Sequence, residues 1–306
     1  MFQPVTSVFH AAIMAAWAVA AGMFAFHALR AAGQITYVTL ADGRRQERKL
    51  PLTFRLLLPF APNLEKAVRG EAFAGAREKA DALIVTAGYE GLVSGWEFMA
   101  LKFLSAFTLG PLWCLGAHFA TAAAPALRPM FPLICVLGVL LIYAHPSAWL
   151  NAAARARQAL ILRAMPFVLD LLTLSVEAGL DFMSAMQRSA DRPVIDPLSE
   201  ELLRVTREIQ VGSSRRKALK AMSERVNLPD MRSLVNALVQ ADELGVSIST
   251  ILRIQSDQIR KRRFERAEKL ANEAPVKLLA PLMIFIFPSV FLILLGPVIF
   301  QLAQRL

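Results

Sequence analysis

The sequence predicts an all-α integral membrane protein with four transmembrane helices and a cytoplasmic helical bundle. Two observations lead to this fold class. All 24 acidic residues lie in two stretches, 30–97 and 151–277. The remaining sequence consists of four apolar runs without an acid, each near the roughly 20 residues that a helix needs to cross a bilayer. Core packing alone can account for part of the 56% of residues that are hydrophobic, but not for several such runs.

The four predicted spans cover residues 5–29, 98–120, 130–150 and 278–301. Lys102 is the one basic residue inside them, and it lies near the end of its run, where a long side chain can reach the headgroups. The first run is expected to stay in the protein as a helix. It has no basic residue before it, it is long for a signal peptide, and Arg30 follows it.

The distribution of Lys and Arg predicts the orientation of the chain. Stretch 30–97 carries ten of these residues and stretch 151–277 carries 21. Basic loops stay on the cytoplasmic side, so both stretches are expected there. The predicted domains are a first span (1–29), a small cytoplasmic helical region (30–97), a transmembrane hairpin (98–150), the cytoplasmic bundle (151–277), and a last span with a short outer tail (278–306).

Glycine junctions divide the larger cytoplasmic stretch into helices. Three glycines lie 33 residues apart, and each is followed by an Asp or Ser that can cap the next helix: Gly179 by Asp181, Gly212 by Ser214, and Gly245 by Ser247. A proline-containing turn lies between successive junctions, so residues 181–212 and 214–245 are predicted to form two helical hairpins. Two units are too few for a solenoid, and one compact bundle is the preferred architecture.

Two further helices are predicted in this stretch. Pro166 suits the first position of a helix. The last helix is expected to run from about Ser249 to Glu273 and then almost directly into the span that begins at Leu278. Its expected buried side is Ile251, Ile259, Leu270, Ala271 and Ala274. Such continuity would carry a push on the bundle into the membrane, which is a hypothesis at this stage.

The smaller cytoplasmic stretch begins polar and irregular through Lys49 and is mostly helical from Leu50. An apolar patch at residues 54–60 follows Pro51. It is too short to span the membrane. It is predicted to pack on the cytoplasmic bundle, with a position at the membrane surface as the alternative.

No pattern of catalytic or cofactor-binding residues is present in the sequence. It contains no Walker phosphate loop, nucleophile elbow or HExxH helix, and no cofactor or metal is predicted. Both cysteines, Cys114 and Cys135, lie in predicted spans as packing residues. The histidines also lie in the spans, and no acid accompanies them, so hydrogen bonding is preferred over metal binding or proton relay: His10, His27, His118 and His145.

The last span contains several residues that interrupt helices. Pro288 and Pro297 are expected to kink it, because proline removes a backbone hydrogen bond. Broken helices also form binding sites in transporters, so a membrane transporter or channel subunit remains the alternative function. Inverted repeats and polar groups at mid-depth, which a transporter needs, are missing.

Two basic clusters, residues 215–217 and 260–266, lie in the bundle stretch. Each has two interpretations, a solvated surface or a docking surface for an acidic partner. Basic charge at the N-terminus of a helix opposes the helix dipole, which favours an external partner for the first cluster. The charges of both cytoplasmic stretches are mixed in sign, so no nucleic acid is predicted as a partner.

Several helix ends and the last span carry further motifs: Glu177-Ala178-Gly179-Leu180, Gly212-Ser213, Glu243-Leu244-Gly245, and Phe287-Pro288 through Leu295-Gly296-Pro297. Together they resemble the type II secretion system F domain of inner-membrane platform proteins. The resemblance covers about residues 160–300 and extends more loosely to 80–120. One copy of the domain in 306 residues is most similar to the tight-adherence (Tad/Flp) pilus branch of the family.

The resemblance implies a function without catalysis. Such proteins sit in the bacterial inner membrane and couple a cytoplasmic secretion ATPase (TadA-like) to extraction of pilin from the bilayer. The resemblance further implies a sister platform protein (TadB-like) and a homo- or hetero-oligomer. From their positions in the chain, the residues expected to face the ATPase are Arg215, Arg216 and Lys217, with Glu177 and Glu243.

Overall fold

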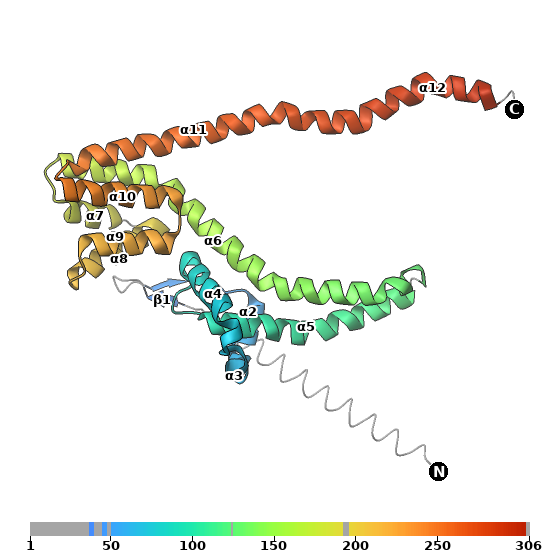
Figure 1. Cartoon of the computed structure of the whole chain (residues 1–306), viewed down its shortest axis with the longest axis horizontal. Helices are drawn as coiled ribbons and strands as arrows, with labels where there is room; N and C mark the ends of the chain where they lie inside the picture. Colours follow the sequence, from blue (N-terminus) through green and yellow to red (C-terminus); the bar gives the residue numbers. More distant parts are fainter. Residues whose placement is uncertain (1–36, 40–44, 48–49, 124, 192–195, 304–306) are drawn as a thin grey trace, which may run out of the picture.

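The computed structural model describes residues 37–39, 45–47, 50–123, 125–191 and 196–303 (Figure 1). A helical bundle lies at one end, and two long helical arms extend from it: the α5–α6 hairpin and the α11–α12 arm. The first predicted span, residues 5–29, lies outside the described residues. The elements are β1 (Tyr37–Thr39), β2 (Arg45–Glu47), α2 (Leu52–Leu57), η1 (Leu58–Leu64), α3 (Glu65–Val68), η2 (Glu71–Phe73), α4 (Ala74–Ala87), α5 (Gly95–Ala123), η3 (Pro125–Met130), α6 (Phe131–Glu177), α7 (Phe182–Ala190), α8 (Pro197–Gln210), α9 (Arg215–Val226), α10 (Pro229–Leu244), α11 (Ile248–Pro281), the π-helix η4 (Leu282–Ile286) and α12 (Phe287–Ala303).

A short β-hairpin is the exception to the predicted all-α fold. Strands β1 and β2 pair antiparallel, with Tyr37 opposite Glu47 and Thr39 opposite Arg45. The prediction that the chain is irregular up to Lys49 is wrong at these positions. The signal was present in the sequence, because Tyr, Val and Thr favour strands and the Asp42-Gly43 dipeptide favours a hairpin turn.

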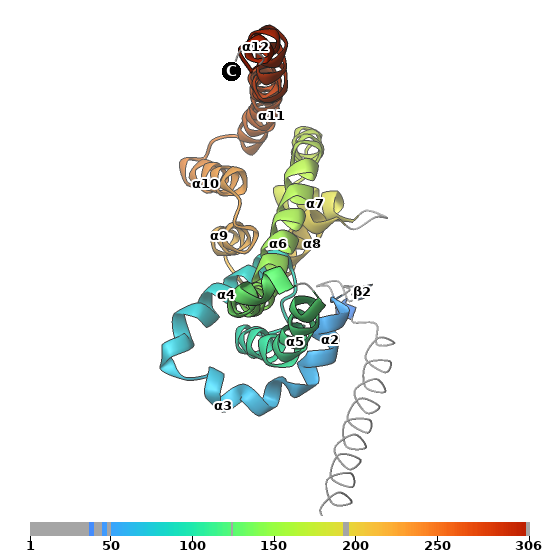
Figure 2. The same ribbon diagram turned by 90° about the vertical axis from the view of Figure 1, so that its right-hand side faces the viewer.

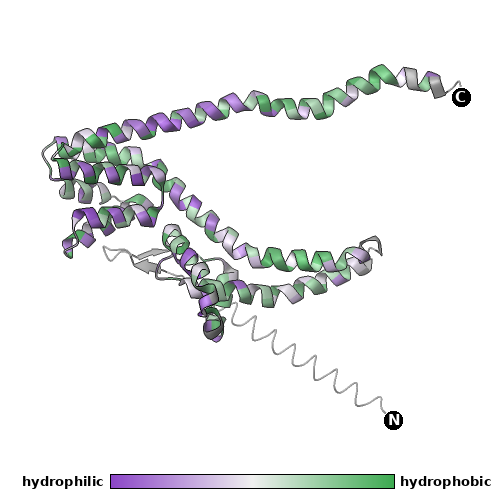
Figure 3. Ribbon diagram, in the orientation of Figure 1, coloured by the Kyte–Doolittle hydropathy of each residue, from purple (hydrophilic) through white to green (hydrophobic). Residues whose placement is uncertain are grey.

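Among the described residues, three helical segments are long and apolar enough to cross a membrane: Gly95–Thr121, Arg128–Glu177 and Ile248–Pro297. They contain the predicted spans 98–120 and 130–150 and most of 278–301. Figure 3 shows hydrophobic residues concentrated in the α5–α6 hairpin and in α12, whereas hydrophilic and hydrophobic residues are mixed along the helices of the bundle. Large apolar side chains in these segments face outward, such as Leu140 at 61% exposed and Leu292 at 73%. Three of the four predicted spans are therefore confirmed as helices of membrane-spanning length and composition.

Helix α6 runs unbroken for 47 residues from the membrane hairpin into the bundle. The predicted helix start at Pro166 is wrong, because Pro166 lies inside α6. Proline has no N–H for the carbonyl four residues earlier, here Leu162. The Arg263 Nη2 donates to that oxygen at 2.8 Å, which supplies the missing donor from α11.

The bundle consists of the hairpins α7–α8 and α9–α10 packed with α6 and α11. Its core contains Met165, Leu172, Met186, Val205 and Leu252, all less than 5% exposed. Successive helices alternate in direction, so the three glycine junctions lie at the same end of the bundle, the end farthest from the apolar arms (Figure 1).

The burial predicted for α11 is only partly correct. Ile259 is buried and Ile251 packs on the core, but Leu270, Ala271 and Ala274 are exposed. Figures 1 and 2 show the reason, since α6 and α11 diverge beyond the bundle and leave this part of α11 without a neighbour among the described residues.

The apolar patch that follows Pro51 was predicted to pack on the cytoplasmic bundle. In the structure it does not contact the core formed by α7–α10. Phe54 and Leu57 of α2 join a separate core with α4 and the membrane-proximal parts of α5 and α6. The ring of Phe54 meets that of Trp149 edge to face, with 4.8 Å between centroids. Residues 50–97 therefore form a collar around the base of the transmembrane hairpin.

Candidate partner-docking end of the bundle

Three glycines shape the end of the bundle farthest from the membrane arms, which we call the junction end. Gly179, Gly212 and Gly245 have φ values of +92°, +106° and +66°, in the left-handed region that glycine adopts without a Cβ clash. The junction end comprises these glycines and the helix termini that they join, residues 174–182, 208–216 and 241–253.

Side-chain caps start two of the helices that follow the junctions. The Asp181 carboxylate accepts from the Met183 N–H at 3.0 Å, and the Ser214 hydroxyl accepts from the Lys217 N–H at 3.3 Å. Ser247 departs from the predicted pattern. It makes no side-chain cap, and its hydroxyl instead lies 2.7 Å from that of Ser249.

Ion pairs link the helix termini at the junction end. Arg215 lies 3.1 Å from Asp242, and Arg216 lies 2.6 Å from Glu243, so both pairs join the start of α9 to the end of α10. A similar ion pair joins the C-terminal end of α6 to the N-terminal part of α11, where Arg253 lies 2.8 Å from Glu177. All these side chains are about one-third or more exposed, so each pair contributes about 0–1 kcal/mol.

These pairs change the interpretation of the predicted ATPase-facing residues. Arg215 and Arg216 are unfavourable at the N-terminus of α9, and an acid is equally unfavourable at the C-terminus of α10. Placed side by side, the two sets of charges compensate each other within the chain. The helix dipole therefore gives no separate reason to expect an external partner for these residues. Lys217 is exposed and has no side-chain ion pair among the described residues.

Apolar side chains at the junction end were not singled out from the sequence. Val211 is 82% exposed, Leu244 is 77% exposed and Val246 is 45% exposed. Each adjoins a junction glycine in the sequence, and that adjacency is the signal that could have found them. Apolar residues that remain exposed beside a rim of polar groups are typical of protein-binding surfaces.

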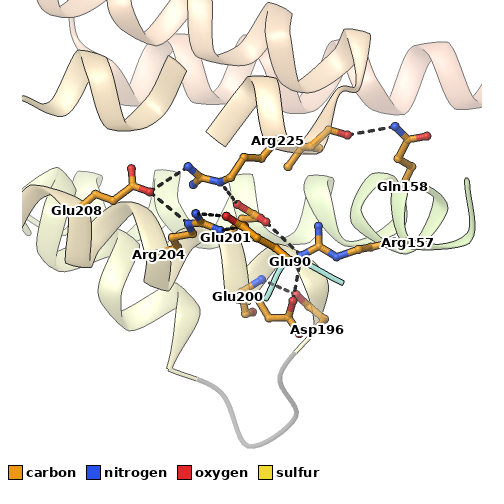
Figure 4. A network of polar contacts seen from close by, with 11 residues as sticks. Glu90, Arg157, Gln158, Asp196, Glu200, Glu201, Arg204, Glu208 and Arg225 are labelled. Atoms are coloured by element: carbon orange, nitrogen blue, oxygen red, sulfur yellow. Dashed lines mark hydrogen bonds and ion pairs between the residues drawn. The ribbon is translucent and has the colours of Figure 1, made fainter. Parts of the chain in front are cut away.

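An ion network with a buried centre joins α6, α8 and α9 of the bundle (Figure 4). Arg157 of α6 donates to Glu200 at 3.0 Å and to Glu201 at 3.1 Å. Arg225 of α9 reaches Glu201 at 3.0 Å and Glu208 at 2.9 Å. The side chains of Arg157, Glu200 and Glu201 are less than 10% exposed. Such a network fixes how α6, α8 and α9 pack, because breaking one partner leaves a buried charge.

The same network reaches the collar through Arg204. Its guanidinium lies 2.5 Å from Glu90, which follows α4, and 3.3 Å from Glu208. The hydrogen bond from Arg204 lowers the pKa of Glu90 below its usual value, against the opposing effect of desolvation. The hydrogen bond to Glu90 likewise raises the pKa of Arg204. The collar and the bundle are thus joined by a charged contact.

The second basic cluster, residues 260–266, also has partners within the chain. Arg260 and the Ser256 hydroxyl bind Asp170 of α6, while Arg262 and Arg266 bind Asp230 of α10. Asp230 is only 5% exposed. The cluster therefore also has a role within the chain, since four of its basic residues, Arg260, Arg262, Arg263 and Arg266, fasten α11 to α6 and α10.

The α11–α12 arm contains a π-helical turn close to Pro288, one of the two prolines that were expected to kink the last span. The π-helix η4 ends directly before α12, and Pro288 is the second residue of α12. Pro297 lies inside α12. The Ser289 hydroxyl donates to the Phe285 carbonyl at 2.6 Å. π-helical turns of this kind are often found at functional sites.

The titratable residues of the spans show packing contacts. The ring of His118 packs against Phe119 and Phe131, and Cys114 and Cys135 are free thiols. Among the residues that the structure describes, no three His, Cys, Asp or Glu side chains gather as a metal site would require. His10 and His27 lie outside that part of the chain.

Part of the chain matches a known protein-family model. Residues 168–296 match the model of the type II secretion system (T2SS) protein F. The matched range runs from the bundle part of α6 through α12, and it contains the whole junction end. No curated protein and no solved structure matches the chain.

Proposed function

We propose, from the premise that residues 168–296 form a T2SS protein F domain, that this chain is an inner-membrane platform protein of a Tad/Flp-type pilus assembly machine. The domain indicates the family of secretion and pilus platform proteins, which are not catalytic. Within that family the chain resembles TadC. Its role would be to couple a cytoplasmic secretion ATPase to pilin extraction and fibre assembly.

One observation carries the mechanical part of the proposal. The bundle is continuous with two membrane arms, because α6 and α11 each run from the junction end to an apolar segment without a loop. A force applied at the junction end would reach the bilayer through two helices that are joined by the pair of Asp170 with Arg260 and by the hydrogen bond from Arg263 to the Leu162 carbonyl.

The ATPase would dock at the junction end. That end lies farthest from the apolar arms, and it presents exposed apolar residues together with three partly exposed ion pairs. Since Arg215, Arg216, Glu177 and Glu243 already have partners in the chain, we assign the main contact to Val211 and Leu244. Lys217 would then meet an acidic group of the partner, and the ion pairs would set orientation.

Pilin and a TadB-like sister protein would meet the arms in the bilayer. Many large apolar side chains face outward on α12 and on the parts of α5 and α6 within the predicted spans, which suits contact with the hydrophobic helix of a pilin or of another platform subunit. The acid-free spans favour this role over transport, the alternative, because transported ions need polar groups within the membrane.

Loss of surface pili is the direct test of the proposed function. Deletion of the gene should abolish piliation, and the wild-type gene should restore it. Normal pili in the deletion strain would contradict the proposal, whatever the docking residues turn out to be.

A further inference from the structure

A pocket of about 330 Å³ lies where the collar meets the transmembrane hairpin. Phe54 and Leu57 of α2 form one wall. Ser105 and Leu109 of α5, and Leu141 and His145 of α6, form the others. The lining is therefore mostly hydrocarbon, and it is built by three elements that are distant in sequence.

The pocket opens within the membrane, near its cytoplasmic side. Lys102 marks the cytoplasmic end of the α5 span, and Ser105 and Leu109 lie three and seven residues beyond it. At the rise of an α-helix, this places them about 5 and 10 Å into the hydrocarbon. At the mouth, Leu109 is 39% exposed and Leu141 is 59% exposed. The surrounding medium at this depth is lipid rather than water.

The shape and chemistry of the pocket restrict its occupant. Water needs two to four polar partners in a buried site. The polar residues of the lining are Thr53, Ser105 and His145, and the Ser105 hydroxyl already donates to the Lys102 carbonyl at 2.9 Å, while the other lining residues are apolar. A helix with its side chains is about 10 Å wide, so two turns would need on the order of 900 Å³. A single hydrocarbon chain fits the available volume.

We propose that this pocket holds one acyl chain of a phospholipid from the cytoplasmic leaflet. The headgroup would then lie near Lys102, one helical turn from Ser105. The Lys102 ammonium lies 4.4 Å from the centroid of the Tyr143 ring, at the level where anionic headgroups attract basic side chains. The lipid would fill the space beneath α2 and fasten the collar to the hairpin, independently of what docks at the junction end.

The occupant can be identified by photo-crosslinking in the full chain. Photo-leucine, a diazirine analogue about the size of the side chain that it replaces, is introduced at Leu109 so that the pocket stays open, and the protein is reconstituted in vesicles of phosphatidylglycerol and phosphatidylethanolamine. After irradiation, mass spectrometry is expected to find a phospholipid adduct on the α5 peptide, with phosphatidylglycerol enriched over its share of the vesicle. A Lys102→Gln variant should lose that enrichment.

A matched pair of variants separates a resident lipid from the lipids that surround any membrane protein. Leu109→Trp fills the pocket, whereas Leu112→Trp changes a residue on the same helix that is 66% exposed and does not line the pocket. With a phosphatidylglycerol that carries a diazirine in its acyl chain, Leu109→Trp should reduce labelling of the α2 peptide by about tenfold or more. Leu112→Trp should leave the labelling unchanged.

Two results would overturn the proposal. Equal labelling in both tryptophan variants would mean that only surrounding lipid is detected. An internal crosslink from position 109 to residues 5–29, with no lipid adduct, would mean that the chain fills its own pocket. Both variants are first shown to elute from a size-exclusion column at the same volume as the wild type, so that misfolded protein is excluded from the comparison.

Discussion

Replacement of Arg157 by Met is the sharpest test of how the bundle is held together. Arg157 is 8% exposed and one of its nitrogens bonds both Glu200 and Glu201, which are each 6% exposed. In the variant, Arg225 still neutralises Glu201, but the buried network has lost a positive charge. Breaking a buried ion pair from one side costs about 3–5 kcal/mol. For a domain of this size, that corresponds to a fall in Tm of about 6–20 °C.

The control variant is Arg204→Met, in the same network. Arg204 is 39% exposed and Glu90 is 48% exposed, so water replaces the lost contact and the cost is about 0–1 kcal/mol. Thermal unfolding of the full chain in detergent, followed by circular dichroism, measures both. Equal shifts in Tm for the two variants would refute the view that burial makes the Arg157 contact the stronger one.

Three further outcomes follow from other contacts. Asp230→Asn should weaken the attachment of α11 by about 1.5–3 kcal/mol, seen as faster hydrogen exchange in residues 248–266 and not in α8; unchanged exchange there would contradict it. Arg263→Ala should cost about 1 kcal/mol by leaving the Leu162 carbonyl without a donor, and this cost should shrink in a Pro166→Ala background, where residue 166 regains its N–H; equal costs in both backgrounds would refute the explanation. The pKa of Glu90 is lowered in the folded state, so Glu90 should stabilise the fold above its usual pKa of 4.5, and this stability should be lost as the pH falls through the lowered pKa. Arg204→Met should therefore make the free energy of unfolding less dependent on pH in this acidic range. An unchanged pH dependence in the variant would show that the contact is not formed.

The helical hairpins of the bundle could be read from the sequence because their signals are local. Glycine and a following Asp or Ser mark the end of one helix and the start of the next within three residues, as at Gly179 and Gly212. Membrane spans are equally local, since twenty apolar residues in a row satisfy the condition by themselves.

Features that depend on a distant residue could not be read in this way. Pro166 suggests a helix start unless the arginine nearly one hundred residues later is known to bond the Leu162 carbonyl. The apolar residues around Leu270 suggest burial, yet whether they are buried depends on where α6 turns. The network around Arg157 leaves no periodic pattern in the sequence, because its members come from three helices, α6, α8 and α9.

The candidate docking residues combine a feature that the sequence predicts with one that depends on distant residues. Their position was predictable, since the glycine junctions place Arg215, Arg216 and Glu243 near one another at one end of the bundle. Their ion pairing was not predictable, because the pairing of Arg216 with Glu243 follows from the packing of α9 against α10. The exposure of Val211 and Leu244 likewise depends on how the helices pack.

Co-purification of the secretion ATPase with the full chain tests the central proposal most directly. The chain is isolated from membranes of its own cell as wild type, as Val211→Asp with Leu244→Asp, and as Leu160→Asp. Leu160 is 50% exposed on α6, closer to the membrane than the junction end, and serves as the matched control. We expect the double variant to lose at least about tenfold of the bound ATPase, since two apolar anchors are worth roughly 2 kcal/mol or more, and Leu160→Asp to retain it. Equal recovery of the ATPase with all three proteins would contradict docking at the junction end.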